Sequence, residues 1–255
     1  MTDRMLKRRI WNGLPKPVRR AISFGWRHTP GKTLDWGTLR RLEPLSPRLG
    51  NDRGTPTNRY FYKKFLIEYR AAIVGHVMEI KEDYYASELA SGPITLTIVD
   101  IKADNPLIDL CADLAVAGSL PAETYDCAIV TGVLQFVSDL DAALQNLYAS
   151  LRPGGVALII VPTAARVDTE DFEYDRWRLT PTGLATVAAR ACVGAEITTK
   201  GYGNILAVVA FLYGIAAEEL TTDELEYNDP VYPLIACAVV RKPRTQGAGG
   251  SATPG

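Results

Sequence analysis

Acidic side chains are concentrated in one short segment that follows a predicted strand. The segment RVDTEDFEYDRW, residues 166–177, contains five acidic residues and a tyrosine. A carboxylate held near a reacting hydroxyl accepts its proton, which is general-base catalysis. Most carboxylates in such a run are ordinarily solvated. We expect the catalytic group of this protein to be among Asp168, Asp171 and Tyr174.

Two further carboxylates stand where predicted strands end. Asp100 ends the apolar stretch ITLTIVD, and a carboxylate there offers two acceptor oxygens to two hydroxyl donors. Its alternative role is that of a turn residue, with Asp104 as the substitute acid. Glu79 lies in VMEIKEDYYA, residues 77–86, at the end of a strand-like run. It either accepts a hydrogen bond from a ligand or caps the next turn.

These residues must be positioned by alternating strands and helices. Apolar runs predict strands at residues 76–80, 94–101, within 107–114, 125–137 (running into a turn), 156–162, 195–202 and 232–243. Apolar residues at helical spacing predict helices at 56–73, 139–151, from about Thr180 and Pro181 onward, and 205–220. The last of these helices is apolar nearly all round, so we expect it to be buried either in its own chain or against a partner. The alternation predicts an α/β, doubly wound, mostly parallel sheet that binds ligands outside the carboxyl ends of its strands.

One long stretch resembles a known family. YDCAIVTGVLQFVSDLDAALQNLYASLRPGGVALIIVP, residues 125–162, is similar to the second half of a class I S-adenosylmethionine-dependent methyltransferase core. In that family a strand leads to a turn, an amphipathic helix, an L-x-P-G-G stop and another strand. Residues 75–243 follow the family's order of elements, which implies a Rossmann-like, seven-stranded sheet whose last strand is antiparallel. More narrowly, NDRGTPTNRYFYKKFL and GYGNILAVVAFLYGIAAEELTTDEL resemble bacterial methyltransferase type 11-like domains encoded beside, or fused to, glycosyltransferases.

The resemblance implies that S-adenosylmethionine is the cofactor. Asp100 would accept hydrogen bonds from the ribose hydroxyls, and Asp113 would either read the adenine amino group or serve as a simple helix cap. Thr131 and Gly132 would form the floor under the sulfonium, and Gln135 stands where many relatives have a histidine. The expected cofactor residues are Glu79, Lys81, Tyr84, Asp100, Asp113, Leu114, Thr131 and Gly132.

The loop after the first predicted strand departs from the family pattern. Where relatives have a G-x-G-type loop, this chain has IKEDYYA, whose side chains occupy space normally left for the cofactor. Either the loop follows a wider path and Tyr84 or Tyr85 packs on the ligand, or the site is closed. In the second case the domain is a catalytically degenerate module that docks a glycosyltransferase or another biosynthetic partner.

The leading interpretation is O-methylation of a small molecule, and the resemblance favours a sugar or a glycosylated secondary metabolite. The tyrosines expected at this substrate have core packing as their alternative role. His28 and His76 are expected to be structural, His76 because it opens the first strand at the end opposite the site. The expected substrate residues are Arg59, Tyr60, Tyr62, Arg176, Trp177, Arg178, Tyr202 and Asn204.

Charge is distributed unevenly along the chain. Residues 1–50 carry twelve Lys or Arg against three acidic residues, which is +9, whereas the remainder carries sixteen against twenty-six, which is −10. The basic arm RMLKRRIWNGLPKPVRR would meet an anionic membrane, a nucleotide-sugar diphosphate, another protein or the chain's own acidic body. An acidic body disfavours nucleic acid as the substrate. We expect an arm at residues 1–55, a methyltransferase-like domain at 56–243 and a disordered tail at 244–255.

Cysteine usage and hydropathy predict the cellular setting. The cysteines lie far apart within apolar runs, which predicts buried thiols of a reduced protein and no metal site. No run of about 18 uncharged apolar residues is present, and charges interrupt the N-terminus where a signal peptide needs its apolar stretch. We therefore expect a soluble, cytoplasmic protein. The four cysteines are Cys111, Cys127, Cys192 and Cys237.

Overall fold

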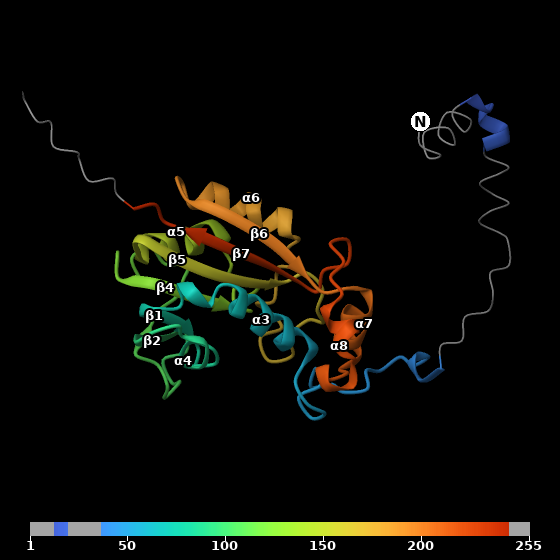
Figure 1. Ribbon diagram of the computed structural model, residues 1–255, viewed down its shortest axis with the longest axis horizontal. Coiled ribbons are helices and arrows are strands. Elements are labelled where there is room, and N and C mark those ends of the chain that lie inside the picture. Colours follow the sequence, from blue (N-terminus) through green and yellow to red (C-terminus); the bar gives the residue numbers. More distant parts are fainter. Residues whose placement is uncertain (1–12, 20–36, 245–255) are drawn as a thin grey trace, which may run out of the picture. The chain divides into compact units, whose positions relative to one another are not determined.

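The computed structural model describes residues 13–19 and 37–244. The chain forms two compact units, residues 1–42 and residues 43–255. The first unit includes a 3-10 turn, η1, at Gly37–Leu39, and the second carries a sheet with its helices (Figure 1). Within these described ranges, no helix is both long enough and apolar enough to cross a bilayer. Most of the expected basic arm, together with the expected tail from residue 245, lies outside them.

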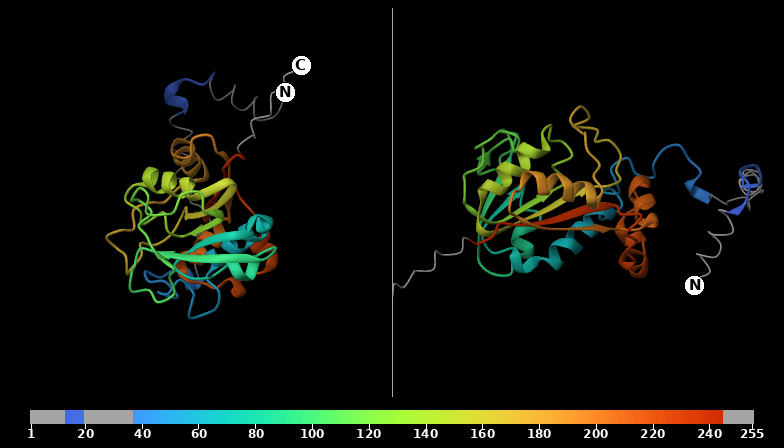
Figure 2. Two further views of the ribbon diagram at one scale, coloured as in Figure 1. Left: turned by 90° about the vertical axis from the view of Figure 1, so that its left-hand side faces the viewer. Right: turned by 90° about the horizontal axis from the view of Figure 1, so that it is seen from above.

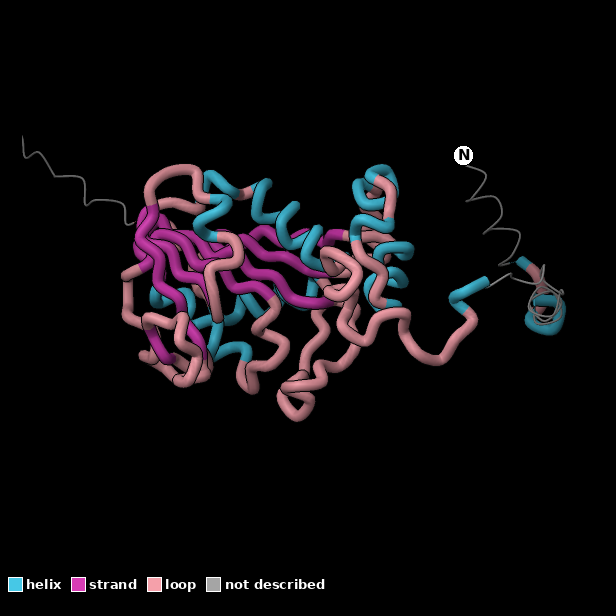
Figure 3. The backbone as a smooth tube through the Cα atoms, turned by 90° about the horizontal axis from the view of Figure 1, so that it is seen from below, coloured by secondary structure: helices cyan, strands magenta, loops and turns pink. Residues whose placement is uncertain are grey.

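One seven-stranded sheet forms the centre of the second unit (Figure 3). Its strand order is β3-β2-β1-β4-β5-β7-β6. Strands β1 to β5 pair in parallel, whereas β7 runs antiparallel to both β5 and β6. This topology confirms the predicted doubly wound sheet with an antiparallel last strand. The strands are Gly75–Ile80 (β1), Ile94–Asp100 (β2), Leu110–Cys111 (β3), Tyr125–Thr131 (β4), Leu151–Pro162 (β5), Glu196–Tyr202 (β6) and Ile235–Arg241 (β7).

Helices cover both faces of this sheet (Figures 1 and 2). On one face, Leu144 of α5 and Leu184 of α6 join a buried cluster with Ile159 of β5. On the other face, Phe61 of α3 and Phe211 of α7 join a second buried cluster. Burial from both sides explains why the central strands are apolar almost throughout. The helices are Thr57–Glu68 (α3), Arg70–Ala72 (η2), Ala86–Leu89 (α4), Leu140–Ser150 (α5), Pro181–Ala191 (α6), Ile205–Tyr213 (α7), Ala217–Glu219 (η3) and Thr222–Glu226 (α8).

Local capping signals start the two helices on the first face. The Asp139 carboxylate accepts a hydrogen bond from the amide of Ala142 at 3.0 Å, which caps α5. The Thr180 hydroxyl accepts from the amide of Gly183 at 3.0 Å, and Pro181 occupies the first helical position of α6. The predicted start of α6 at Thr180 and Pro181 is confirmed.

Helix α7 differs from its prediction. The expected helix over residues 205–220 ends at Tyr213, because Gly214 adopts a left-handed conformation with φ +71° that closes the last turn. Of the two expected ways to bury this helix, its own chain supplies burial on one side only. The structure buries Ala207, Ala210 and Phe211, and it leaves Ile205, Leu206 and Leu212 at 53%, 41% and 42% exposure.

Three smaller predictions need correction. Helix α3 ends at Glu68 rather than at residue 73, and η2 follows it. Strand β5 begins at Leu151, so RPGG lies within the strand span and not only at the end of α5. Cys111 is exposed, because the two-residue strand β3 lies at the edge of the sheet, while the other three cysteines are buried.

Residues 43–55 are bound to the end of α7 and to η3. The amides of Leu45 and Ser46 donate to the carbonyl of Tyr213 at 2.8 and 3.1 Å, and Arg53 forms an ion pair with Glu219. The second compact unit accordingly begins at residue 43, which differs from the domain start at residue 56 expected from the sequence.

Gly214 is expected to be needed for this contact. Its left-handed backbone lies so close to Ser46 that an added Cβ would collide with the Ser46 carbonyl, whereas Gly194, with φ +82°, has open space around it. We expect Gly214→Ala to lower the free energy of unfolding by about 3 kcal/mol, against about 1 kcal/mol for Gly194→Ala. Urea denaturation followed by circular dichroism compares the two. Equal losses would show that backbone conformation alone, without the close approach, sets the requirement.

Candidate functional site

The carboxyl ends of β1, β2 and β4 meet at one edge of the sheet. The chain runs outward from β1 to β2 and β3 and then returns to β4 on the other side of β1. Ligands of parallel α/β sheets bind at such a reversal. Asp100 and Thr131 are the last residues of β2 and β4, and Glu79 is the penultimate residue of β1. The topology therefore brings these three predicted residues to one edge.

Glu79 holds the start of α4. Its side chain is buried, and its carboxylate accepts hydrogen bonds from the amides of Tyr85 at 3.1 Å and Ala86 at 2.8 Å. Burial raises the pKa of Glu79 to about 7, and the two backbone donors oppose that rise. This geometry matches the alternative in which Glu79 caps the next turn.

The loop after β1 turns at Lys81 without a glycine. Lys81 has φ +76°, in the left-handed region where glycine is usual. Its amide donates to the carbonyl of Val99 at 2.8 Å, and its carbonyl accepts from Asn105 Nδ2 at 2.8 Å. Bonds to β2 and to the loop after it therefore fix the turn.

Arg59 joins helix α3 to the same loop. Its guanidinium donates to the Tyr85 hydroxyl at 3.1 Å and lies 4.4 Å from the centre of the Tyr84 ring. Tyr85 is buried, whereas Tyr84 is 36% exposed. Of the two tyrosines expected to pack on a ligand, Tyr84 is thus the more accessible.

Asp100 and Asp113 both bind backbone amides. The buried Asp100 accepts from the amide of Lys102 at 3.2 Å through Oδ1 and from Asn105 Nδ2 at 2.8 Å through Oδ2. Asp113 Oδ1 accepts from the amide of Ala115 at 2.9 Å, as a capping residue does. Leu114, beside it, is buried. Each Asp100 oxygen has one donor here and can accept a second.

Gly132 meets helix α3 at the end of β4. Its φ is +62°, and a Cβ on it would lie 3.1 Å from the hydroxyl oxygen of Tyr62. The carbonyl of Gly132 accepts from Gln135 Nε2 at 2.7 Å. Glycine therefore permits the Tyr62 hydroxyl to approach the backbone. Burial raises the pKa of Tyr62 to about 12, so this hydroxyl stays protonated.

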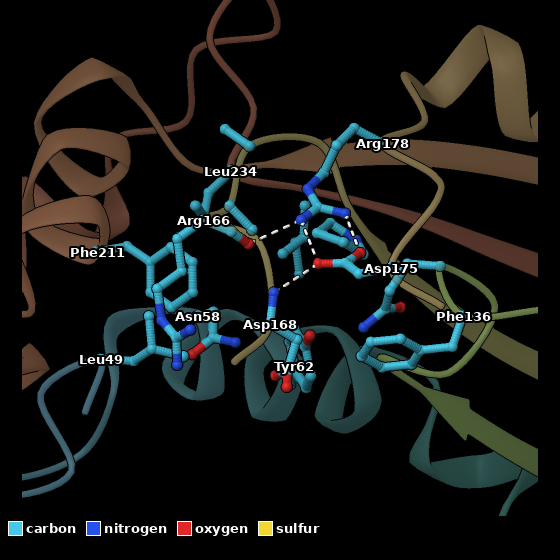
Figure 4. Close-up of a pocket in the computed structure, with 15 residues that line it drawn as sticks. Leu49, Asn58, Tyr62, Phe136, Arg166, Asp168, Asp175, Arg178, Phe211 and Leu234 are labelled. Carbon is cyan, nitrogen blue, oxygen red and sulfur yellow. Dashed lines mark hydrogen bonds and ion pairs between the residues drawn. The ribbon is translucent and has the colours of Figure 1, made fainter. Parts of the chain in front are cut away.

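A cavity of about 90 Å³ lies between α3, the loops after β4 and β5, and the start of β7. In Figure 4, Asn58 and Tyr62 on α3 lie below the loop that carries Arg166, Asp168, Asp175 and Arg178. Of the residues predicted for the site, Tyr62, Asp168 and Arg178 line this cavity. The eight predicted cofactor residues do not line it, and they lie at the neighbouring strand ends.

A buried ion pair braces one wall of the cavity. Arg178 binds the Asp175 carboxylate through two hydrogen bonds of 2.5 and 2.8 Å, and it donates to the carbonyl of Arg166 at 2.7 Å. The Asp175 side chain is 2% exposed and also accepts from the amide of Asp168 at 2.8 Å. Hydrogen bonding from Arg178 holds the pKa of Asp175 below its usual value. Both terminal nitrogens of Arg178 are thus engaged within the chain.

The three predicted catalytic residues occupy different environments. Asp168 lines the cavity, and its Oδ1 accepts from the amides of Glu170 at 2.8 Å and Asp171 at 3.1 Å. Asp171 lies 3.7 Å from the ammonium of Lys102. Tyr174 is 56% exposed. The structure brings only Asp168 of these three to the cavity.

Arg176 and Trp177 hold two loops together. Arg176 Nη1 donates to the carbonyl of Phe136 at 2.9 Å, and Trp177 Nε1 donates to that of Val137 at 2.7 Å. The amide of Arg176 also donates to the carbonyl of Gln135 at 2.8 Å. These donors, predicted to bind the substrate, fasten the loop after β5 to the loop after β4.

Three other predicted substrate residues are engaged away from the cavity. Tyr60 donates its hydroxyl to Glu226 at 2.5 Å, and Tyr202 donates to Glu68 at 2.6 Å. Asn204 caps α7 by accepting from the amide of Ala207 at 2.9 Å.

Histidine is not found at this site within the described residues. His76 lies at the start of β1, with Nε2 2.8 Å from the Thr97 hydroxyl oxygen. This position agrees with the structural role expected for it. His28 lies outside the described residues.

Asn58, Gln135 and Arg166 are among the cavity residues that were absent from the predicted site. Asn58 precedes the predicted Arg59 by one position, Gln135 follows β4, and Arg166 opens the acidic segment. The position of Gln135, where relatives carry a histidine, was the one available sequence signal. Asn58 and Arg166 had none, because they meet only in the folded chain.

Comparison with known proteins identifies similar sequences. A family model described as a methyltransferase domain matches residues 61–189, just over half of the chain. Malonyl-[acyl-carrier protein] O-methyltransferase of Serratia marcescens is 32% identical over 111 residues, which are 40% of this chain and 44% of that enzyme. The chain therefore spans less than half the length of this curated relative.

Solved structures share the fold at low identity. A chain in the complex between the Haloferax volcanii Trm112 methyltransferase activator and a methyltransferase has a TM-score of 0.50 at 15% identity, covering 73% of this chain and 92% of that one. An S-adenosylmethionine-dependent methyltransferase from Archaeoglobus fulgidus has a TM-score of 0.49 at 15% identity, covering 72% and 94%. At this level of identity the likeness concerns the fold.

Glu79 makes stability depend on pH. Its folded pKa of about 7 lies above the ordinary value of 4.5, so its contribution is full below pH 4.5 and is lost as pH rises through 7. We expect the free energy of unfolding to fall from pH 5 to pH 8 by up to roughly 3 kcal/mol more in the natural protein than in Glu79→Gln. Urea denaturation at both pH values measures this difference. Parallel pH profiles for the two proteins would contradict it.

Proposed function

Because the chain belongs to the methyltransferase domain family, and its cofactor is S-adenosylmethionine, we propose that it methylates an oxygen of a small molecule, preferentially a sugar or glycosylated metabolite. The observation that carries this proposal is the cavity bordered by Tyr62 and Gln135, the two side chains nearest Gly132, with Asp168 in its wall. The Serratia relative, named for O-methyl transfer to a malonyl group, supports oxygen as the accepting atom.

The residues at the strand ends fit the cofactor. We assign the ribose hydroxyls to Asp100, whose two oxygens each keep one acceptor position after their internal bonds are counted. Asp113 and Leu114 follow β3 in the chain and are assigned to the adenine. Gly132, which a Cβ would crowd against Tyr62, is assigned to the sulfonium floor together with Thr131.

The glycine-poor loop is compatible with this assignment. The Glu79 carboxylate turns inward to α4, so in this proposal it supports the loop and does not contact the cofactor. Lys81 provides the left-handed turn, and Arg59 ties the loop to α3. The partly exposed ring of Tyr84 offers a surface on which the cofactor packs.

The chain's own residues then orient the acceptor and remove its proton. S-adenosylmethionine, when bound, supplies an electrophilic methyl group on a sulfonium and leaves as neutral S-adenosylhomocysteine. The amides of Glu170 and Asp171 both donate to Oδ1 of Asp168, and neither donates to Oδ2. As the new carbon–oxygen bond forms, the hydroxyl proton passes to Asp168. Positioning of the acceptor in the cavity supplies much of the remaining rate.

The preference for a sugar, and a glycosyltransferase as partner, rest on a single resemblance. Residues 51–66 and 201–225 resemble domains found beside or fused to glycosyltransferases. Such a partner would supply the glycoside that this enzyme methylates.

Asp100 is expected to bind the cofactor. Loss of its charge weakens the acceptance of two ribose hydrogen bonds, so Asp100→Asn should reduce the affinity for S-adenosylhomocysteine by about 10- to 100-fold. Asp104→Asn, at an exposed carboxylate in the same loop, is the matched control and should leave it unchanged. Calorimetric titration measures both. A larger loss of affinity in Asp104→Asn than in Asp100→Asn would assign the ribose to Asp104.

Asp168 is expected to be the general base. Asp168→Asn should lower the rate of methyl transfer about 100-fold while the affinity for S-adenosylhomocysteine stays unchanged. Glu170→Gln, at an exposed carboxylate in the same turn, is the control and should behave like the natural protein. The measurement is transfer of a radiolabelled methyl group to a panel of methyl glycosides. Full activity of Asp168→Asn would exclude this role.

A further inference from the structure

Three buried polar atoms without partners border the cavity between α3 and the loops after β4 and β5. They are Asn58 Oδ1, Gln135 Oε1 and Arg166 Nε, and within the described part of the chain none has a hydrogen-bond partner. Their residues come from three different elements and line one cavity. Buried polar atoms without partners are rare because they are costly. The cluster therefore points to a ligand that supplies the missing partners.

Internal hydrogen bonds fix which atom of each side chain remains available. Gln135 Nε2 donates to the carbonyl of Gly132 at 2.7 Å, so Oε1 is the remaining end. Asn58 Oδ1 is likewise buried and unpaired. Arg166 Nη1 donates to the carbonyl of Val167 at 2.8 Å, whereas its buried Nε has no partner. These three atoms thus offer two acceptors and one donor.

The charges around the cavity cancel. Two cations, Arg166 and Arg178, and two anions, Asp168 and Asp175, line it. The Asp175 carboxylate already neutralises Arg178. The free amide oxygens of Asn58 and Gln135 have no proton to offer an anion. A neutral hydroxyl, which both donates and accepts, suits this arrangement better than a carboxylate does.

The size and the apolar lining restrict the ligand further. A volume of about 90 Å³ is well below the roughly 300–1,000 Å³ of pockets that enclose a whole ligand. Phe136, Phe211 and Leu234 are among the apolar residues of the lining. The cavity therefore admits one hydroxylated edge of a larger molecule, with carbon-bound hydrogens against the apolar side chains.

We propose that Asn58, Gln135 and Arg166 form a diol-recognition subsite that selects a neutral polyol as the methyl acceptor. Two acceptor hydroxyls donate to the amide oxygens of Asn58 and Gln135, and one of these hydroxyl oxygens accepts from Arg166 Nε. The subsite rests on the proposed function, because it names the class of acceptor for the same site. It also distinguishes this chain from enzymes whose acceptor is an acid.

The test is ligand-observed saturation-transfer NMR on the full chain, with and without S-adenosylhomocysteine. The neutral probes are methyl β-D-glucopyranoside, methyl α-L-rhamnopyranoside and myo-inositol, and malonate is the anionic probe. We expect at least one neutral probe to bind and malonate not to bind. Asn58→Leu and Gln135→Met should each raise the dissociation constant of that probe about 10-fold. Gln145→Met, on the exposed face of α5, should leave it unchanged.

Calorimetric affinity for S-adenosylhomocysteine separates the two proposals. If the natural protein does not bind S-adenosylhomocysteine, the proposed function is refuted. Binding of a neutral probe in that case would still support Asn58, Gln135 and Arg166 as a site for a polyol. Retained affinity with no binding of any neutral probe, or with stronger binding of malonate, would overturn the subsite alone. Unchanged probe binding in both Asn58→Leu and Gln135→Met would overturn it as well.

Discussion

The pairing of β1 with a parallel strand on each side is the constraint on which the site depends. Glu79 pairs with Ile98 of β2 and with Ile129 of β4, so its side chain is enclosed at the centre of the sheet. A carboxylate in such a place needs donors, and the amides at the start of α4 supply them. The position of α4, and with it the course of the loop after β1, follows from the burial of one side chain.

The loops at the other end of the site are fixed by contacts between distant parts of the chain. Arg176 and Trp177 bind carbonyl groups 40 residues earlier in the sequence, and Arg178 pairs with the buried carboxylate of Asp175. A cavity wall built in this way is held by directional bonds to backbone atoms. It keeps its shape without help from regular secondary structure, which explains how irregular loops position Asp168.

Features set by residues close together in the sequence were predicted better than features set by contacts between distant residues. Thr180 followed by Pro181 is a local signal, and it located the start of α6 correctly. Gly214 was a local signal too, but the apolar run on both sides of it outweighed the stop that its left-handed backbone imposes. The succession of strands and helices along the chain, read from apolar runs and turn positions, was likewise predictable.

The side chains that line the cavity were harder to predict from the sequence. Asn58 and Arg166 carry no pattern of their own, and only the packing of α3 beneath the loop after β5 brings them together. In the opposite sense, Tyr202 and Asn204 looked available in the sequence, but partners from α3 and from the segment after α7 already occupy their polar atoms. A sequence gives the donors and acceptors of a site, and the fold decides which of them remain free.

The turn at Lys81 has a consequence for how such domains diversify. Asn105, from the loop after β2, and Val99, within β2, hold that turn, and no glycine supplies the conformation. A search keyed to glycine fingerprints would pass over a loop of this kind. Residues of the loop after β2 thus determine the conformation of the loop after β1. We therefore expect substitutions in these two loops to be coupled in evolution.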